Sequence, residues 1–584
     1  MALGREELLA VTRLRPRGGR RRSGPARRLS APGSPALWAA AFGLATLVAR
    51  LLYAASGPTD WDSVQYVVGS EHFDVTHGAP QPPGYWLYVA LGHVVHVVSG
   101  LTPTSALVLL AALASAGAAA ATVAAGWALG GRFTALSGAA LVATAPVSWF
   151  NGSIVATYSF DALTGALLVL LARRARPGSF HGVVAVVVYA LATGLRPSAA
   201  EVFLVLVLIP VMASTRGLRQ WMLTLASAVA AMALWFVPMV EVQPGGLSAW
   251  WHATRLESAG AADASSIFVT ATGGRTNLGT FAAWALLTMG PALVLGLVAT
   301  VVLGLARAAT RRPAGDVTRR IWSLATNTEL AWYQRSPVIV AAAVVPPLGL
   351  VTLVQFAKGG YLLSFLPAAT VALLLPVSRL VHHRQAALRH AAVMIAGVAL
   401  VAACGFNIER FTEEPGILPR SFALSHPWWW ISQARYQSPY ADTASTIAAA
   451  DRADTELRRL GAMVDPSRDV VVALSLGAGL ELYRNIGAAV PGVRVALVSW
   501  SPPILLYEEL GGLLYYDSST TVAVGPGGYA YVLTAPPASG LATEGTYVAT
   551  LADFRVWRLS PGAQIGGVRV VADSGTRPLG TAVH

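Results

Sequence analysis

Long apolar windows, separated by short polar connections, fill residues 36–405, and no further window of this kind follows them. An α-helix needs roughly 20 mostly apolar residues to cross a bilayer, and several windows approach that length. The windows lie at 36–56, 84–100, 105–128, 135–150, 154–172, 182–195, 199–214, 220–240, 280–306, 337–356, 361–377 and 391–405. This pattern predicts a polytopic α-helical membrane domain over residues 36–405, followed by a separate domain over residues 406–584.

The composition agrees with a membrane protein. Hydrophobic residues make up 54% of the 584 residues and charged residues only 12%, which excludes a soluble globular enzyme or a disordered chain. The net charge of +13 would ordinarily raise nucleic acid as a partner, but residues 1–35 alone carry nine arginines against Glu6 and Glu7. We therefore expect residues 1–35 to form a disordered, basic cytoplasmic arm that binds no nucleic acid.

The placement of arginine predicts the topology, because cytoplasmic loops retain Lys and Arg while short translocated loops avoid them. Residues 57–83 contain neither Lys nor Arg and should lie outside. If every later window crossed once, the arginine cluster at 173–176 would also lie outside, against the rule. We therefore predict that 84–100 is an outer interfacial or re-entrant helix, that about 11 windows cross the cell membrane, and that the C-terminal domain is extracytoplasmic. The external membrane loops then keep four basic residues: Arg196, Arg255, Arg275 and Lys358.

The C-terminal domain has the pattern of an α/β fold. Residues 468–477 and 493–500 are typical of buried strands, and residues 478–490 between them are typical of a helix. Further strands are predicted within 521–525, 529–535 and 546–551. Three consecutive tryptophans at 428–430 suit either anchoring at the membrane surface or an aromatic platform for sugar.

Two residue types occur only once. Cys404 is the only cysteine, so no intrachain disulfide can form. Lys358 is the only lysine among the 42 Lys and Arg residues, which indicates a GC-rich coding bias.

The first external loop, with the helix expected to follow it, spans residues 57–104 and holds the most polar chemistry. Its carboxylates are Asp60, Asp62, Glu71 and Asp74, and a Pro-Gln-Pro-Pro-Gly turn follows them. Asp62 and Tyr66 are four residues apart, so a helix would place them on one face. The sequence leaves open a solvated loop with ordinary helix caps, and the Asp-Trp-Asp sequence at 60–62 also suggests a divalent-metal site.

This loop resembles the first external loop of the membrane-embedded GT-C glycosyltransferases, especially family 39, which includes protein O-mannosyltransferases and lipid A aminoarabinose transferases. The resemblance lies in Asp62, in Tyr66 one turn later, and in 82-PPGYWLYVALG at the start of the next helix. It continues in order through 151-NGSIVATYSFDALTGALLVLLARR, 194-GLRPSAAEVF and 357-AKGGYLLSFLPA. The family often has His before the Pro-Pro pair where this chain has Gln81, so a role for that His does not carry over.

The resemblance implies a GT-C membrane domain that transfers a sugar from a polyprenyl phosphate carrier to an extracytoplasmic glycan, lipid or protein. Asp62 would be the general base of an inverting transfer, and Asp161 would be a second acid that orients the acceptor or the base. The substrate would contact Asp60, Tyr66, Arg196 and Lys358, the last two through the donor phosphate. No cofactor is implied, although a divalent metal remains an alternative.

The chemistry of the loop agrees with this interpretation. Nucleotide sugars are cytoplasmic, so an enzyme whose polar groups face outward needs a donor that is linked to a lipid. An acceptor hydroxyl needs a base, and a leaving phosphate needs positive charge. Two other interpretations remain open, a transporter or flippase of lipid-linked sugars and a noncatalytic relative. Transporters tend to show internal repeats and ionisable groups near the midplane, and this sequence shows no visible repeat.

Overall fold

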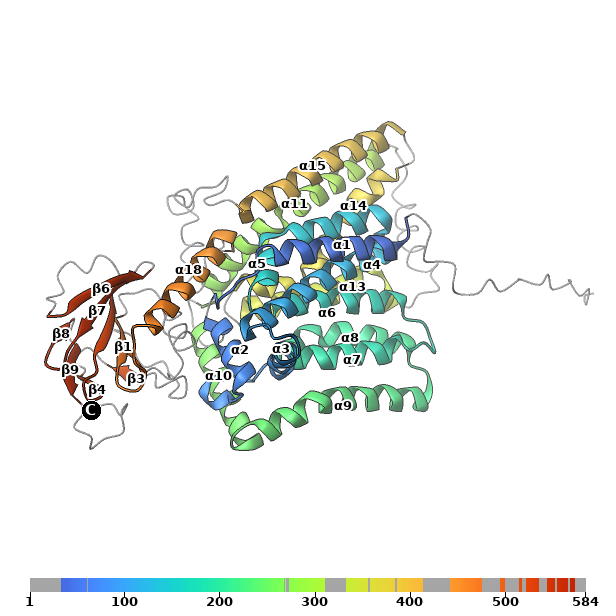
Figure 1. Cartoon of the computed structure of the whole chain (residues 1–584). Coiled ribbons are helices and arrows are strands. Elements are labelled where there is room, and N and C mark those ends of the chain that lie inside the picture. Colours follow the sequence, from blue (N-terminus) through green and yellow to red (C-terminus); the bar gives the residue numbers. More distant parts are fainter. Residues whose placement is uncertain are drawn as a thin grey trace, which may run out of the picture.

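The computed structural model consists of a helical bundle followed by two small β-sheets (Figure 1). Asp60, an expected substrate contact, lies outside the described residues, as do the tryptophans at 428–430 and the predicted helix at 478–490. The structure describes residues 33–59, 61–266, 268, 273–309, 332–354, 358–383, 386–412, 442–474, 494–498, 514–516, 521–534, 544–551, 554–565 and 568–572.

The apolar windows correspond to helices, which confirms the predicted helical membrane protein. The last helix continues to Thr412, so it passes the domain boundary that we predicted at residue 405. The helices of the bundle are α1 (Pro35–Leu51), α3 (Trp86–Ser99), α4 (Pro103–Thr144), α5 (Pro146–Ser153), α6 (Tyr158–Arg174), α7 (His181–Leu195), α8 (Ala199–Ser214), α9 (Gly217–Val242), α11 (Gly273–Ala309), α13 (Ser336–Leu353), α14 (Leu366–Val381) and α15 (Ala386–Thr412). Shorter or more polar helices connect them: α2 (Trp61–Glu71), η2 (Val75–His77), α10 (Gly246–Ser265), η3 (Trp332–Gln334) and η4 (Gly359–Ser364).

Local signals explain where several helices begin and end. Ser34 and Thr102 cap α1 and α4 by accepting backbone N–H bonds, and a proline follows each cap. Within α4, Gly131 has φ +83°, a conformation that glycine adopts without steric cost. Gly126 then lies so close to Ala135 that an added Cβ would be 2.8 Å from the Ala135 Cα atom. The chain therefore folds back at Gly131, and α4 accounts for two of the predicted windows.

Among the described residues, five helices are long and apolar enough to cross a membrane. The bent pair α5 and α6, with an angle of 119°, counts as a sixth if it is one span, and five further apolar helices are shorter. Figure 1 shows α3 nearly end-on while α4 and α6 to α9 run across the view. α3 therefore runs in a different direction from these helices. The interfacial position of residues 84–100 and the number of crossings both stay predictions.

The C-terminal region contains helix α18 (Ala444–Gly461) and two sheets. The larger sheet has the order β3-β2-β1-β5-β7-β6, parallel from β3 to β5 and antiparallel beyond it. Its strands include those predicted around 470, 495, 530 and 548. The strands are β1 (Val470–Leu474), β2 (Arg494–Val498), β3 (Leu514–Tyr516), β4 (Thr521–Val524), β5 (Ala530–Thr534), β6 (Thr546–Leu551), β7 (Phe554–Leu559), β8 (Gln564–Ile565) and β9 (Val568–Ala572). The smaller sheet has the order β4-β9-β8.

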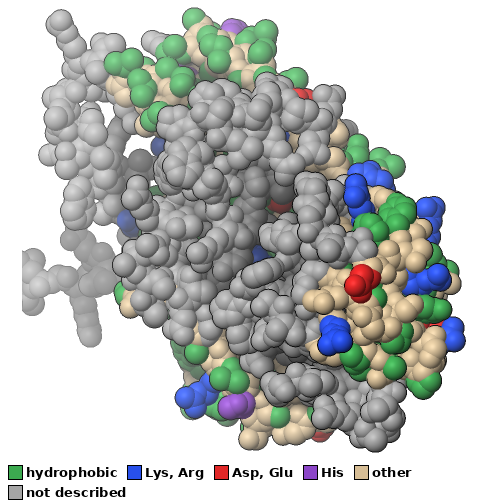
Figure 2. All heavy atoms as spheres, turned by 90° about the vertical axis from the view of Figure 1, so that its left-hand side faces the viewer, with side chains coloured by type: hydrophobic (Ala, Val, Ile, Leu, Met, Phe, Trp, Pro, Cys, Tyr) green, Lys and Arg blue, Asp and Glu red, His purple; other side chains and the backbone are tan. Residues whose placement is uncertain are grey.

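The end of the bundle that bears these sheets is opposite to the end at which α1 begins (Figure 1). Figure 2 looks onto the sheet-bearing end and shows more basic than acidic side chains on its described part. The exposed arginines of this region are Arg452, Arg459, Arg468, Arg555, Arg558 and Arg569. α2, α5, α10 and α18 gather at the same end of the bundle, where the candidate site is found.

Candidate active site

Asp62 lies in the first turn of α2, where a carboxylate interacts favourably with the helix dipole. Neighbouring contacts hold this helix in place. The Ser63 hydroxyl donates to the Val155 carbonyl at 3.0 Å, and an added Cβ at Gly69 would be 2.6 Å from Pro80. Tyr66 is 3% exposed, on the same face as Asp62. The predicted pair is therefore on one helix face, and that face is packed against the protein.

Lys358 immediately precedes the short helix η4 and contacts Asp62. Its Nζ atom is 2.8 Å from the Asp62 Oδ2 atom, although the two residues are 296 positions apart. The Lys358 and Asp62 side chains are 19% and 12% exposed, respectively. Two glycines hold the following backbone close to aromatic rings. A Cβ atom added at Gly359 would be 2.8 Å from the Trp284 ring, and a Cβ atom added at Gly360 would overlap the Tyr158 ring. The Lys358 side chain therefore extends from a closely packed turn.

Arg196 and Asp161 form a second ion pair, which is far more enclosed. The Arg196 Nη1 atom is 3.3 Å from the Asp161 Oδ2 atom, and the two side chains are 2% and 4% exposed. The guanidinium lies 3.8 Å from the ring centre of Tyr158 and 4.6 Å from that of Tyr361. A desolvated contact of this kind contributes about 2 kcal/mol. The Arg196 Nε–H group donates to the Ser198 hydroxyl at 3.0 Å.

The two ion pairs belong to one cluster, because Lys358 and Tyr361 are three residues apart and Tyr361 contacts Arg196. The structure thus brings together five of the six predicted site residues, namely Asp62, Tyr66, Asp161, Arg196 and Lys358. Among the described residues, no group of three or more His, Cys, Asp or Glu side chains could hold a metal ion.

Tyrosines that we did not single out in the sequence line the same cluster: Tyr85, Tyr158 and Tyr361. Each of these tyrosines lies inside one of the family-like segments, and this position was the signal in the sequence that could have identified them. Tyr85 has a φ of +46°, which is uncommon for a residue with a side chain, and its ring meets that of Tyr66 edge-on at 5.0 Å. Backbone strain of this kind is concentrated at functional sites.

The phenols of Tyr66 and Tyr85 stay protonated at neutral pH. Burial raises the pKa of Tyr85 to about 12, and the positive charge of Arg196 opposes this effect only in part. Burial also raises the pKa of Tyr66 well above its ordinary value, and the carboxylate of Asp62 raises it further. Both hydroxyl groups can therefore donate hydrogen bonds beside Asp62.

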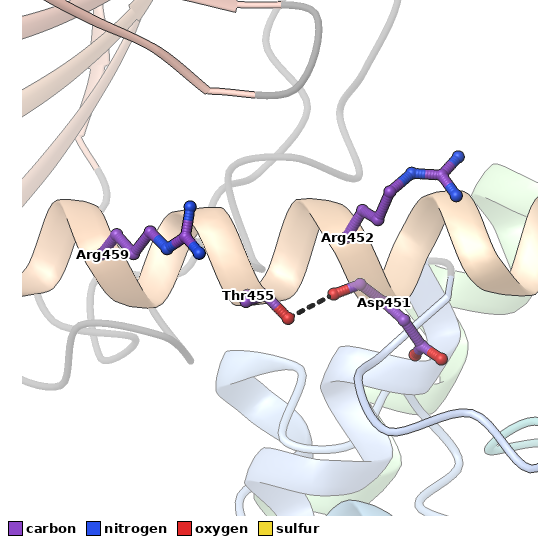
Figure 3. Close-up of a pocket in the computed structure, with 4 residues that line it drawn as sticks. All are labelled: Asp451, Arg452, Thr455 and Arg459. Carbon is purple, nitrogen blue, oxygen red and sulfur yellow. Dashed lines mark hydrogen bonds between the residues drawn. The ribbon is translucent and has the colours of Figure 1, made fainter.

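The C-terminal region contacts the start of this loop. The backbone N–H groups of Ser56 and Gly57 donate to the Asp451 Oδ1 atom at 2.8 and 3.0 Å. Figure 3 shows Asp451 pointing toward that segment, with Arg452 directed elsewhere. A cavity of about 260 Å³ runs along the same helix and is lined by Asp451, Arg452, Thr455 and Arg459. The contact links α18 to the loop that carries Asp62.

No protein-family model and no curated protein sequence matches this chain. Solved structures do show similarity. ArnT from Cupriavidus metallidurans bound to undecaprenyl phosphate is 13% identical, over 90% of this chain and 98% of that one, with a TM-score of 0.49. The same protein in the apo state is 12% identical, over 89% and 97%, with a TM-score of 0.47.

The archaeal oligosaccharyltransferase AglB from Archaeoglobus fulgidus, in complex with an inhibitory peptide and a dolichol-phosphate, is 11% identical. The similarity covers 78% of this chain and 63% of that one, with a TM-score of 0.39. Because every one of these TM-scores is below 0.5, the function has to be inferred from the residues of the site.

Proposed function

We propose that this protein is an integral-membrane glycosyltransferase of the GT-C type that transfers a sugar from a polyprenyl phosphate to an extracytoplasmic glycan, lipid or protein. The observation that supports it most strongly is the partly exposed pair of Asp62 and Lys358 at the sheet-bearing end of the bundle. One carboxylate and one ammonium side by side supply the two charges that this reaction needs. The motifs described above favour the family 39 type.

In the proposed reaction, Asp62 takes the proton of the acceptor hydroxyl. The acceptor oxygen forms a bond to the anomeric carbon while the bond from that carbon to the phosphate oxygen breaks, and the configuration inverts. The electron pair of the broken bond stays on the phosphate, whose charge changes from about −1 to about −2, so a positive group at the phosphate stabilises the transition state. Lys358 is suited to this task because its side chain is partly exposed.

Arg196 and Asp161 have another task in this proposal. Arg196 is almost fully enclosed by Asp161, Tyr158 and Tyr361, so a phosphate could reach it only if a buried ion pair opened. We assign both as positioning residues that hold η4, with Lys358 at its start, against α6 and α7. Tyr66 and Tyr85 are the candidates for hydrogen bonds to the substrate.

The test of this function is the Asp62→Asn variant in a purified assay with a lipid-linked sugar donor. The substitution keeps the size of the side chain and removes the proton acceptor, and loss of a positioned base typically lowers kcat by about 10²- to 10⁴-fold. Glu71→Gln is the matched control, because Glu71 is an exposed carboxylate at the end of the same helix. It should transfer sugar at the unmodified rate.

The transporter interpretation makes a different prediction in the same experiment. A flippase would move a lipid-linked sugar between the leaflets of a vesicle without any acceptor, and no glycosidic bond would form. Transfer at the unmodified rate by Asp62→Asn, from protein of equal folded yield, would remove Asp62 as the base.

A further inference from the structure

The two groups that the proposed reaction uses separately are bonded to each other in this structure. The Asp62 carboxylate and the Lys358 ammonium are 2.8 Å apart. A carboxylate that faces an ammonium holds a proton less readily, so it is a poorer base. An ammonium that faces a carboxylate is likewise less available to a phosphate. The site as it stands is therefore closed to both parts of the reaction.

The Asp62–Lys358 ion pair can open more readily than the neighbouring Arg196–Asp161 pair. Its side chains are 12% and 19% exposed, whereas those of Arg196 and Asp161 are 2% and 4% exposed. The residual contact with solvent lowers the cost of separating the two charges, compared with the fully enclosed pair. The backbone beside Lys358 is held by Gly359 against Trp284 and by Gly360 against Tyr158. The ammonium can thus change partner by moving its own side chain, while the turn stays in place.

The residue type suits this exchange. Lysine carries a compact charge on a flexible four-carbon stem, whereas the planar guanidinium of arginine binds a carboxylate through two parallel bonds. The chain uses arginine at every other Lys or Arg position, and lysine only here. Coding bias explains the many arginines, but it leaves the single lysine at this position without an explanation.

We propose that the Asp62–Lys358 ion pair keeps the site inactive without donor, and that the phosphate of the lipid-linked donor takes Lys358 from Asp62 and so makes the carboxylate available as the base. This inference rests on the proposed function. Donor and carboxylate compete for one ammonium, which means that donor binding precedes activation of the acceptor. The base acts only when a sugar is present to receive the acceptor oxygen.

The competition can be measured by binding alone, without turnover. The probe is farnesyl phosphate, a short polyprenyl phosphate, titrated against the full-length protein in detergent. Asp62→Asn should bind it about two- to tenfold more tightly than the unmodified protein, which is the gain expected if the ion pair is closed roughly 50–90% of the time. Lys358→Gln should bind it more weakly, and Asp62→Asn should give no gain when added to Lys358→Gln.

Glu71→Gln is the control for general electrostatics, because it removes the same charge from the same helix. It should leave the affinity unchanged. Equal or weaker binding by Asp62→Asn would overturn the inference, as would an equal gain in Glu71→Gln. Neither result would bear on the transfer assay. In that assay the proposed function fails if the unmodified protein forms no glycosidic bond, and the role of Asp62 as the base fails if Asp62→Asn transfers sugar normally.

A second measurement covers the case in which Asp62→Asn folds poorly. Because Lys358 is the only lysine, an acylating reagent that is selective for amines has a single side-chain target, which peptide mapping separates from the N-terminal amine. Asp62→Ser should label several-fold faster than the unmodified protein, and farnesyl phosphate should protect Lys358 in both. Unchanged labelling in Asp62→Ser would contradict the ion-pair competition.

Discussion

Arg196 has a structural role in this site. A buried charge is costly unless it is paired, and this one has Asp161 beside it and the rings of Tyr158 and Tyr361 against the guanidinium. These residues come from α6, from the end of α7 and from η4, so the pair joins three parts of the chain. The same joint places Lys358, which lies three residues before Tyr361.

This arrangement predicts a strong coupling between the two buried charges. Asp161→Asn and Arg196→Gln should each lower the free energy of unfolding by about 3–5 kcal/mol, because each leaves the other charge buried without its partner. The double variant should lose clearly less free energy of unfolding than the sum of the losses in the two single variants. Thermal unfolding in detergent measures this, with Arg174→Gln, an exposed arginine at the end of α6, as a control that should change little. Additive losses would show that the pair is not a unit.

At the scale of elements, the first external loop is held from two sides. On the membrane side, the Gln243 side chain at the end of α9 donates to the Asp74 carboxylate at 2.8 Å and accepts from the Val75 N–H group at 2.9 Å. On the other side, Asp451 in α18 accepts two backbone N–H groups of the loop. The C-terminal region is thus connected to the segment that carries the proposed base.

We predict that Asp451→Ala reduces sugar transfer without changing the helix content. The substitution removes two charge-assisted hydrogen bonds, each worth about 1.5–3 kcal/mol, and so loosens the segment before α2. If about half of this free energy falls on the transition state, kcat should fall by about 10- to 100-fold. Asp465→Ala is the matched control, because this partly exposed carboxylate binds Ser467 within its own loop. Equal sugar transfer by the Asp451→Ala and Asp465→Ala variants would show that the contact of α18 with the loop does not contribute to catalysis.

At the scale of the molecule, α1 begins at one end of the bundle, and the sheets lie at the other. An odd number of crossings, such as the predicted 11, would place the start of α1 and the sheets on opposite sides of the membrane, and both the number and the orientation stay predictions. The candidate site lies at the end with the sheets, so the sheets and the site should face the same compartment.

Single cysteines test this orientation in intact cells, in a Cys404→Ala background. Cysteines at Ser99, exposed at the end of α3, and at Ser467, exposed in the C-terminal region, should react with an impermeant thiol reagent. A cysteine at Arg176, exposed between α6 and α7, should react only after lysis. Labelling of position 176 in intact cells would reverse the predicted topology.

The sequence by itself predicted the apolar helices of the bundle and several strands of the C-terminal region, while the side of the membrane on which each charge lies stays a prediction. An apolar window of helix length has one stable conformation in a bilayer, because every backbone polar group must be paired inside the segment. The breaks at Gly131 and Pro146 are equally local, since each follows from the conformation that its residue type prefers or forbids. Arg196 and Lys358 stood out because few cations occur in the expected external loops, whereas Asp60, Asp62, Tyr66 and Asp161 stood out through the polar first loop and the family-like motifs.

Only the tertiary structure decided which charges meet. The sequence assigned Arg196 and Lys358 the same expected role, yet one is enclosed with Asp161 and the other is partly exposed beside Asp62. Asp62 and Lys358 are 296 residues apart, and their contact depends on how α2 packs against η4, which no local pattern encodes. The tyrosines around them could not be predicted for the same reason. The sequence does not distinguish an aromatic residue that faces lipid from one that faces a buried guanidinium.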